Sequence, residues 1–131
     1  MTVSRRTFMA SLGAGATMLA LPASALQGNP TMYGLIGKMR AQPGQRDALV
    51  AILLDGVSGM PGCLSYVVAE DPQDADGLWI TEVWDNQASH AASLSLASVR
   101  DAIAKARPLI AGFDSHTETR PLGGHGLAPA A

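Results

Sequence analysis

Apolar and polar positions along the chain change their spacing several times, and each spacing predicts one type of element. Residues 31–40 are densely apolar, which is typical of a central strand buried on both faces. Residues 45–58 repeat apolar side chains at helical spacing and place Arg46, Asp47 and Asp55 on the opposite face. The remaining elements predicted by the same criteria are strands at 63–70, 78–84 and 113–119, and a helix broken into two pieces at 87–94 and 98–109.

The order of these elements, β-α-β-β-α-β, predicts a ferredoxin-like α+β fold over residues 31–120. Such a fold has a four-stranded antiparallel sheet with its helices on one face, so the other face needs a cover. A domain of about 100 residues buries only part of its surface, and a second copy is the simplest cover. We therefore expect a homodimer. Residues 121–131 are rich in Gly and Ala and are expected to form a flexible tail.

The N-terminus, residues 1–25, has the composition of an export signal. Arg5 and Arg6 precede an apolar stretch, and a small-residue cleavage site ends at Ala25. The paired arginines stand in the run SRRTFM, which resembles the twin-arginine (Tat) export signal. The alternative is an ordinary secretory signal that carries two arginines. The Tat prediction places the mature protein in the periplasm or otherwise outside the cytoplasm, with residues 26–30 as a linker.

Charge and composition exclude several classes of protein. The chain has 131 residues, with 9 Lys+Arg against 11 Asp+Glu. Loss of residues 1–25 removes two arginines and no acidic residue, so the net charge falls from −2 to −4 over the remaining 106 residues. This balance argues against a nucleic-acid partner, and no apolar run of the mature chain reaches the roughly 18 residues of a membrane span. The single cysteine, Cys63, excludes an internal disulfide and a multi-cysteine metal site, and its position predicts a buried, unreactive thiol.

Four segments carry a resemblance to a known family. They read GLIGKMRAQPGQRDAL, MPGCLSYVVAEDP, LWITEVWDNQASHAASL and ARPLIAGF, in that order. In this order and spacing the chain resembles the antibiotic biosynthesis monooxygenases, and within them the branch similar to quinol monooxygenases. The resemblance implies a dimeric α+β barrel that oxidises a quinol with molecular oxygen. It also implies that no metal, flavin or haem cofactor is needed, because the substrate anion itself supplies an electron to oxygen.

Five residues are the candidates for the site. Trp84 matches a pocket position of the family and is suited to stack on an aromatic substrate or to donate its indole N–H. Glu82 and His90 are the candidate catalytic groups, because either can accept a proton from a substrate hydroxyl. Tyr66 and Tyr33 are candidates to bind a substrate oxygen. Each has a structural alternative: a core tryptophan, a structural carboxylate, a helix-surface histidine and two cross-strand packing partners.

Two further histidines have weaker predicted roles. His116 stands in the last predicted strand and is interpreted as part of a dimer interface, whereas His125 falls in the tail. The branch of the family that degrades haem holds iron with a histidine late in the second helical segment. Residues 99–106 contain no histidine, so haem degradation is not expected.

The sequence also departs from the polyketide-type oxygenases of the family, whose polar trio is Asn, Trp and Arg. Trp84 has a counterpart in that trio, but Ile80 stands where the asparagine is expected and no arginine is assignable. Two functions therefore stay open: a quinol monooxygenase, or a non-catalytic dimeric module that binds a small hydrophobic or aromatic ligand.

Overall fold

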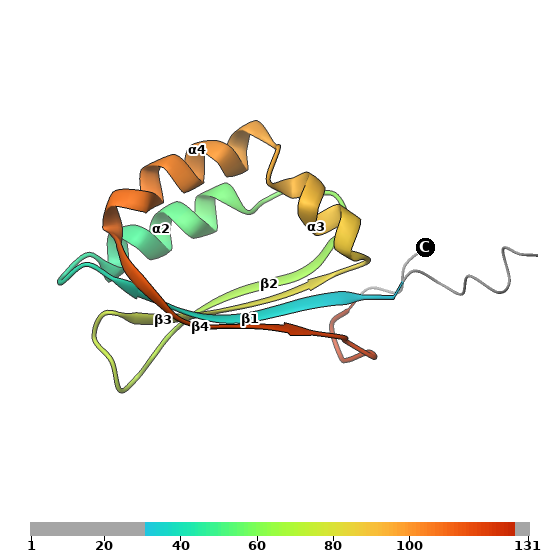
Figure 1. The fold of residues 1–131 in the computed structure, drawn as a ribbon, viewed down its shortest axis with the longest axis horizontal. Helices are drawn as coiled ribbons and strands as arrows, with labels where there is room; N and C mark the ends of the chain where they lie inside the picture. Colours follow the sequence, from blue (N-terminus) through green and yellow to red (C-terminus); the bar gives the residue numbers. More distant parts are fainter. Residues whose placement is uncertain (1–30, 128–131) are drawn as a thin grey trace, which may run out of the picture.

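The computed structural model describes residues 31–127 of the chain. The predicted export signal, the predicted linker and residues 128–131 lie outside the described part. The described part forms a four-stranded antiparallel sheet with all its helices on one face (Figure 1). The strands are β1 (Tyr33–Ala41), β2 (Cys63–Glu70), β3 (Gly77–Trp84) and β4 (Ile110–Thr119), and the helices are α2 (Arg46–Gly56), α3 (Gln87–Ser93), α4 (Ala97–Ala106) and the 3-10 turn η1 (Arg107–Leu109).

This element order confirms the ferredoxin-like α+β class, with two corrections. Strand β4 begins at Ile110 and not at Phe113, because the 3-10 turn that contains Pro108 leads directly into the strand. Strand β1 is central, between β3 and β4, as predicted. Its expected burial on both faces is wrong for the single chain, because Leu35 is buried whereas Ile36 is 39% exposed.

Residues of neighbouring strands line up in rows across the face of the sheet that the helices cover, here called the inner face. The pairing registers give four such rows, each written from β2 to β4 where all strands contribute. They are Cys63–Trp84–Tyr33, Tyr66–Glu82–Leu35–Glu118, Val68–Ile80–Gly37–His116 and Glu70–Leu78–Met39–Phe113. The rows fix which side chains can meet above the sheet.

The core fills the space between α2, α4 and one end of this inner face. Leu49 of α2 and Leu78 of β3 are fully buried and pack with Met39 and Ala106. The two helices come close where Gly56 of α2 faces Ala102 of α4, because any side chain at position 56 would collide with the alanine. The predicted apolar faces of both helices are therefore confirmed.

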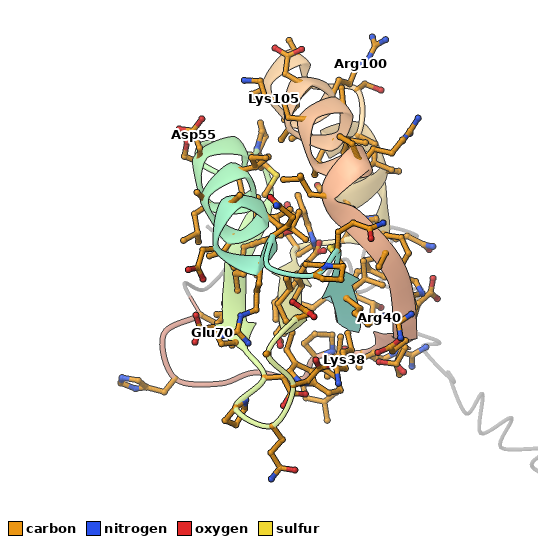
Figure 2. The ribbon with its side chains drawn as sticks, turned by 90° about the vertical axis from the view of Figure 1, so that its left-hand side faces the viewer. Lys38, Arg40, Asp55, Glu70, Arg100 and Lys105 are labelled. Carbon is orange, nitrogen blue, oxygen red and sulfur yellow. The ribbon has the colours of Figure 1, made fainter. Side chains whose placement is uncertain are left out.

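One residue of the polar face predicted for α2, Arg46, is not solvated as expected. Figure 2 shows Asp55 on the solvent side of the helices, as expected. Arg46, in contrast, turns back toward the loop between β2 and β3. Its Nη1 donates to the carbonyl oxygen of Asp74 at 2.8 Å, and its Nη2 lies 3.4 Å from Glu70 Oε2. Arg46 thus anchors this loop and is half-buried, where the spacing alone predicted a solvated side chain.

The loop between β2 and β3 also makes ion pairs and a hydrogen bond on the outer face of the sheet, away from the helices. Lys38 Nζ lies 3.0 Å from Asp71 Oδ2 and 3.2 Å from Asp74 Oδ2, and Trp79 Nε1 donates to Asp71 at 3.1 Å. Hydrogen bonds from backbone N–H groups and from Lys38 lower the pKa of both carboxyls, and the two carboxylates raise the pKa of Lys38. Figure 1 shows the loop curling below the sheet, on the side opposite the helices.

Candidate functional site

A cavity of about 630 Å³ lies between the helices and the inner face of the sheet. Its floor includes Leu35 and Ile80, and its upper wall includes Leu53 of α2 and Ile103 of α4. Most of the lining is apolar. The volume falls within the roughly 300–1,000 Å³ of small-molecule pockets, and the lining has the composition that such pockets share.

Polar side chains gather at the end of the cavity beneath α3. Glu82 and Trp84 stand two residues apart on β3 and therefore point to the same side of the sheet. Trp84 Nε1 donates to Glu82 Oε2 at 2.8 Å, and Trp84 itself is 1% exposed. This confirms that both residues face the cavity, and it shows that the indole N–H, expected to be free for a substrate, is already occupied by Glu82.

His90 enters the same cluster from α3. Its Nε2 lies 3.9 Å from Glu82 Oε2, and its ring meets the ring of Trp84 edge-on with the centroids 5.4 Å apart. The side chains of His90 and Glu82 are 21% and 15% exposed, so both are largely shielded from solvent.

Local sequence fixes the helix that carries His90. Asn86 caps α3 by accepting a hydrogen bond from the backbone N–H of Ser89 at 2.8 Å. Buried Ser93 donates to the carbonyl oxygen of His90 at 2.6 Å. Gly62, in a left-handed conformation (φ 82°), leaves room for the Ser89 side chain directly before β2. The cap predicted at Asp85 or Asn86 is therefore made by Asn86.

Tyr66 lies beside Glu82 and completes the polar end of the cavity. The two residues are paired across β2 and β3, and both line the cavity. Burial raises the pKa of the Tyr66 hydroxyl, and the nearby Glu82 carboxylate raises it further. Tyr66 is therefore a neutral hydroxyl at physiological pH, able to donate or accept a hydrogen bond.

Tyr33 is the one predicted site residue that is absent from the cavity lining. Its ring lies 5.3 Å, centroid to centroid, from the ring of His90, and its hydroxyl donates to Glu118 Oε1 at 2.8 Å. Tyr33 therefore packs against the far side of His90, and its place suits support of the imidazole. That contact joins β1 and β4 and is not visible in the spacing of the sequence, since 85 residues separate Tyr33 from Glu118.

The lining residues that were not predicted as part of the site include His116 and Gly37. His116 lies on the inner face in the row of Gly37, and its predicted place in a dimer interface stays a prediction. β4 shifts its register against β1 at two places, so simple alternation along β4 does not give the face of each residue. A glycine in a strand interior was the available signal for close approach of a ligand.

The other predicted groups lie apart from this cluster or play no polar part in it. Cys63 is half-buried, not fully buried as expected, and its Sγ donates to the carbonyl oxygen of Ser65 at 3.6 Å. Burial raises the pKa of its thiol, which agrees with an unreactive side chain. Within residues 31–127 no group of three or more His, Cys, Asp or Glu side chains is placed to hold a metal ion. No helix in this part of the chain has the length and apolar character to cross a membrane.

Sequence and fold both match known proteins. The antibiotic biosynthesis monooxygenase family matches residues 32–105. A crystal structure of a candidate antibiotic biosynthesis monooxygenase from Chloroflexus aurantiacus J-10-fl is 71% identical, covers 75% of this chain and 100% of that chain, and has a TM-score of 0.74. No curated protein matches the sequence.

Two more distant structures share the fold. A Pseudomonas aeruginosa protein is 21% identical, with 72% of this chain and 98% of that chain covered and a TM-score of 0.64. A candidate antibiotic biosynthesis monooxygenase from Caulobacter crescentus CB15 is 16% identical, with 78% and 100% covered and a TM-score of 0.65.

Proposed function

Because this chain belongs to the antibiotic biosynthesis monooxygenase family, we propose that it oxidises a quinol or a similar phenolic substrate with molecular oxygen. The observation that carries the proposal is the cluster of Glu82, Trp84 and His90 at one end of an apolar cavity of about 630 Å³. The apolar part suits an aromatic ring, and the cluster supplies groups that can take its proton. Independence from a cofactor rests on the family resemblance.

The first step of the proposed reaction is proton transfer. His90 Nε2 accepts the proton of a substrate hydroxyl, and the imidazolium that forms is stabilised by Glu82, 3.9 Å away. Trp84 holds Glu82 in place through its 2.8 Å hydrogen bond and offers its ring to the substrate. An apolar cavity favours the next step because the phenolate loses its hydration shell and becomes a better electron donor.

The second step is reaction of the phenolate with oxygen. An electron passes from the phenolate to O2, and a C–O bond forms at a ring carbon that carries hydrogen. Loss of water then leaves the oxidised product. Overall, one quinol with a free ring C–H and one O2 give one hydroxyquinone and one H2O, so one oxygen atom enters the product and the other leaves as water.

The second candidate function is binding without turnover. It is favoured by one observation: Trp84 Nε1 donates its hydrogen bond to Glu82 and is not free to meet a ligand in the cavity. A binding module would be stabilised by naphthols or quinones by RT ln(1 + [L]/Kd), with no oxygen consumed. If no such ligand raised the Tm, both candidate functions would be contradicted.

The proposal includes export and self-association. We propose that residues 1–25 direct the protein out of the cytoplasm through the twin-arginine route, because Arg5 and Arg6 stand in the run SRRTFM. Replacement of both arginines by lysine is expected to retain the precursor in the cytoplasm, and normal export of that variant would contradict the route. The exposed apolar side chains Ile36 and Val67 support a homodimer through the outer face of the sheet.

An oxygen electrode tests the reaction itself. A naphthoquinol is mixed with enzyme in air-saturated buffer, and oxygen uptake above autoxidation is expected. Simple two-electron oxidation would release H2O2, so added catalase would return oxygen to the solution, whereas the proposed reaction returns none. With 18O2, one labelled atom is expected in the hydroxyquinone. Uptake equal to the rate without enzyme would contradict the proposal.

A further inference from the structure

Gly37 stands in the middle of β1 with no backbone requirement for glycine. Its φ is not positive, and an added Cβ would make one tight contact, with the carbonyl oxygen of Ser115 at 3.3 Å, which a shift of a few tenths of an ångström would relieve. Two buried glycines have stronger steric reasons: a side chain at Gly34 would collide with Thr119, and one at Gly56 with Ala102. A glycine inside a strand weakens it, and the one tight contact at Gly37 lies on the side of β4, so the missing side chain also leaves open space toward the cavity.

That space opens into the cavity. Gly37 lines the cavity floor and lies in the row between Ile80 of β3 and His116 of β4. The neighbouring row carries Glu82 and Leu35. The absent side chain therefore leaves a hollow directly beside the Glu82–His90 pair, and His116 bounds the hollow on the side of the edge strand.

The register sets the span between the two polar ends. Glu82 and His116 lie on strands separated by β1 and in adjacent rows. Two interstrand spacings of about 4.8 Å and a rise of two residues place their Cα atoms about 12 Å apart. Inner-face side chains stand roughly perpendicular to the sheet, so their heads are separated by a similar distance. Hydrogen bonds of about 2.8 Å at each end leave about 6 Å between two ligand oxygens, which is the span of one carbon ring with oxygens at opposite positions.

We propose that Gly37 and His116 form a second subsite that selects substrates with two oxygens at opposite ends of an aromatic ring. One oxygen meets His90 and Glu82, and the other is hydrogen-bonded by His116. The ring lies against the bare backbone at Gly37, which makes this glycine a specificity-determining residue. The inference rests on the proposed function for the choice of ligand class, but it concerns binding and is testable without turnover.

The role of His116 is tested with two ligands that differ by one atom. Anaerobic titrations followed by tryptophan fluorescence give the Kd of 4-methoxy-1-naphthol and of 4-ethyl-1-naphthol, in which a CH2 replaces the ether oxygen. The wild type is expected to bind the methoxy compound about tenfold more tightly, the effect of one hydrogen bond. In His116→Ala this ratio falls to about one, whereas His125→Ala, which alters a histidine in the tail, keeps it. An unchanged ratio in His116→Ala, or no preference in the wild type, would overturn the role of His116.

The role of Gly37 is tested by filling the hollow. Gly37→Val is expected to raise the Kd of both naphthols at least tenfold and that of phenol less than twofold, because phenol is smaller and, with a single oxygen, is free to bind nearer Glu82 and away from Gly37. Gly37→Ala is expected to give a smaller change in the same order and serves if the valine variant does not fold. Equal effects on phenol and naphthols, or none on either, would overturn the subsite.

These experiments separate the subsite from the proposed function. A protein that shows the predicted ligand preferences but consumes no oxygen would retain the subsite and lose the monooxygenase proposal. A protein that oxidises quinols with no effect of either substitution on ligand preference would retain the activity and lose the subsite.

Discussion

The two faces of the sheet are made by the same strands but differ in how far their apolar side chains are covered. On β3, alternate residues point to opposite sides, so Leu78 is fully buried under the helices whereas its neighbour Trp79 is 36% exposed on the outer face. The inner face is covered by the helices over β1 and β3, apart from one cavity, whereas at the edge strand β4 it stays open, with Phe113 68% exposed. The outer face keeps apolar side chains such as Val67, 51% exposed, without a cover among residues 31–127.

The polar groups of the two faces differ in the same way. On the inner face, Glu82 and His90 lie in a poorly hydrated space and are held by single contacts to Trp84 and to each other. On the outer face, Lys38 and Asp71 belong to a network that ties down a loop. This contrast fits the proposals made above, in which the inner face carries the reaction and the outer face carries self-association.

The largest expected difference between the faces is in stability. Trp84→Ala empties a fully buried position and is expected to cost about 3–5 kcal/mol of the free energy of unfolding. Trp79→Ala, the matched substitution on the outer face, removes a half-exposed ring and one hydrogen bond and should cost clearly less. Urea denaturation of both variants at equal protein concentration measures the two losses. Equal losses would contradict the contrast in burial.

A smaller change is expected when the outer face is made charged. Ile36→Glu and Val67→Glu place a carboxylate on half-exposed positions, so the fold of one chain should be altered by no more than about 0.5 kcal/mol. In the proposed homodimer the same charges are buried opposite each other, so the mass from light scattering should fall from that of a dimer to that of a monomer. A monomeric wild type, or dimeric variants, would contradict association through this face.

The smallest expected effect is the pH dependence of the outer-face network. The pKa values of Asp71 and Asp74 are lowered in the folded state, so these carboxylates add stability above the ordinary aspartate pKa of about 3.9. That contribution is lost as the pH falls through the lowered values. The double variant Asp71→Asn, Asp74→Asn should therefore show a shallower loss of stability between about pH 5 and pH 2. An identical acid profile would show that the network does not couple to folding.

Much of this structure was predictable from the sequence, because each strand and helix carries its own periodic pattern. The alternation in 78–84 correctly placed Glu82 and Trp84 on one face, and they do share the cavity with His90. Contacts between distant segments were not predictable. The bond from Tyr33 to Glu118 and the anchoring of a loop by Arg46 depend on which strands become neighbours, and no local pattern records that.

The sequence also could not show which residues of β4 point to the inner face of the sheet. Register shifts between β1 and β4 break the alternation, so the sequence did not show that His116 lines the cavity. Gly37 was passed over for a different reason. A single glycine in an apolar strand carries no chemistry of its own, and its meaning depends on what the helices leave open above it.

The most direct test of the central claim, that the inner face holds a proton-accepting site for oxidation of a quinol, is the rate of oxygen uptake by His90→Ala. With a naphthoquinol as substrate, kcat/KM is expected to fall by about 10² to 10⁴, the usual contribution of a general base. His125→Ala serves as the matched control and should keep the wild-type rate. A His90→Ala protein that is folded and consumes oxygen as fast as the wild type would contradict the claim.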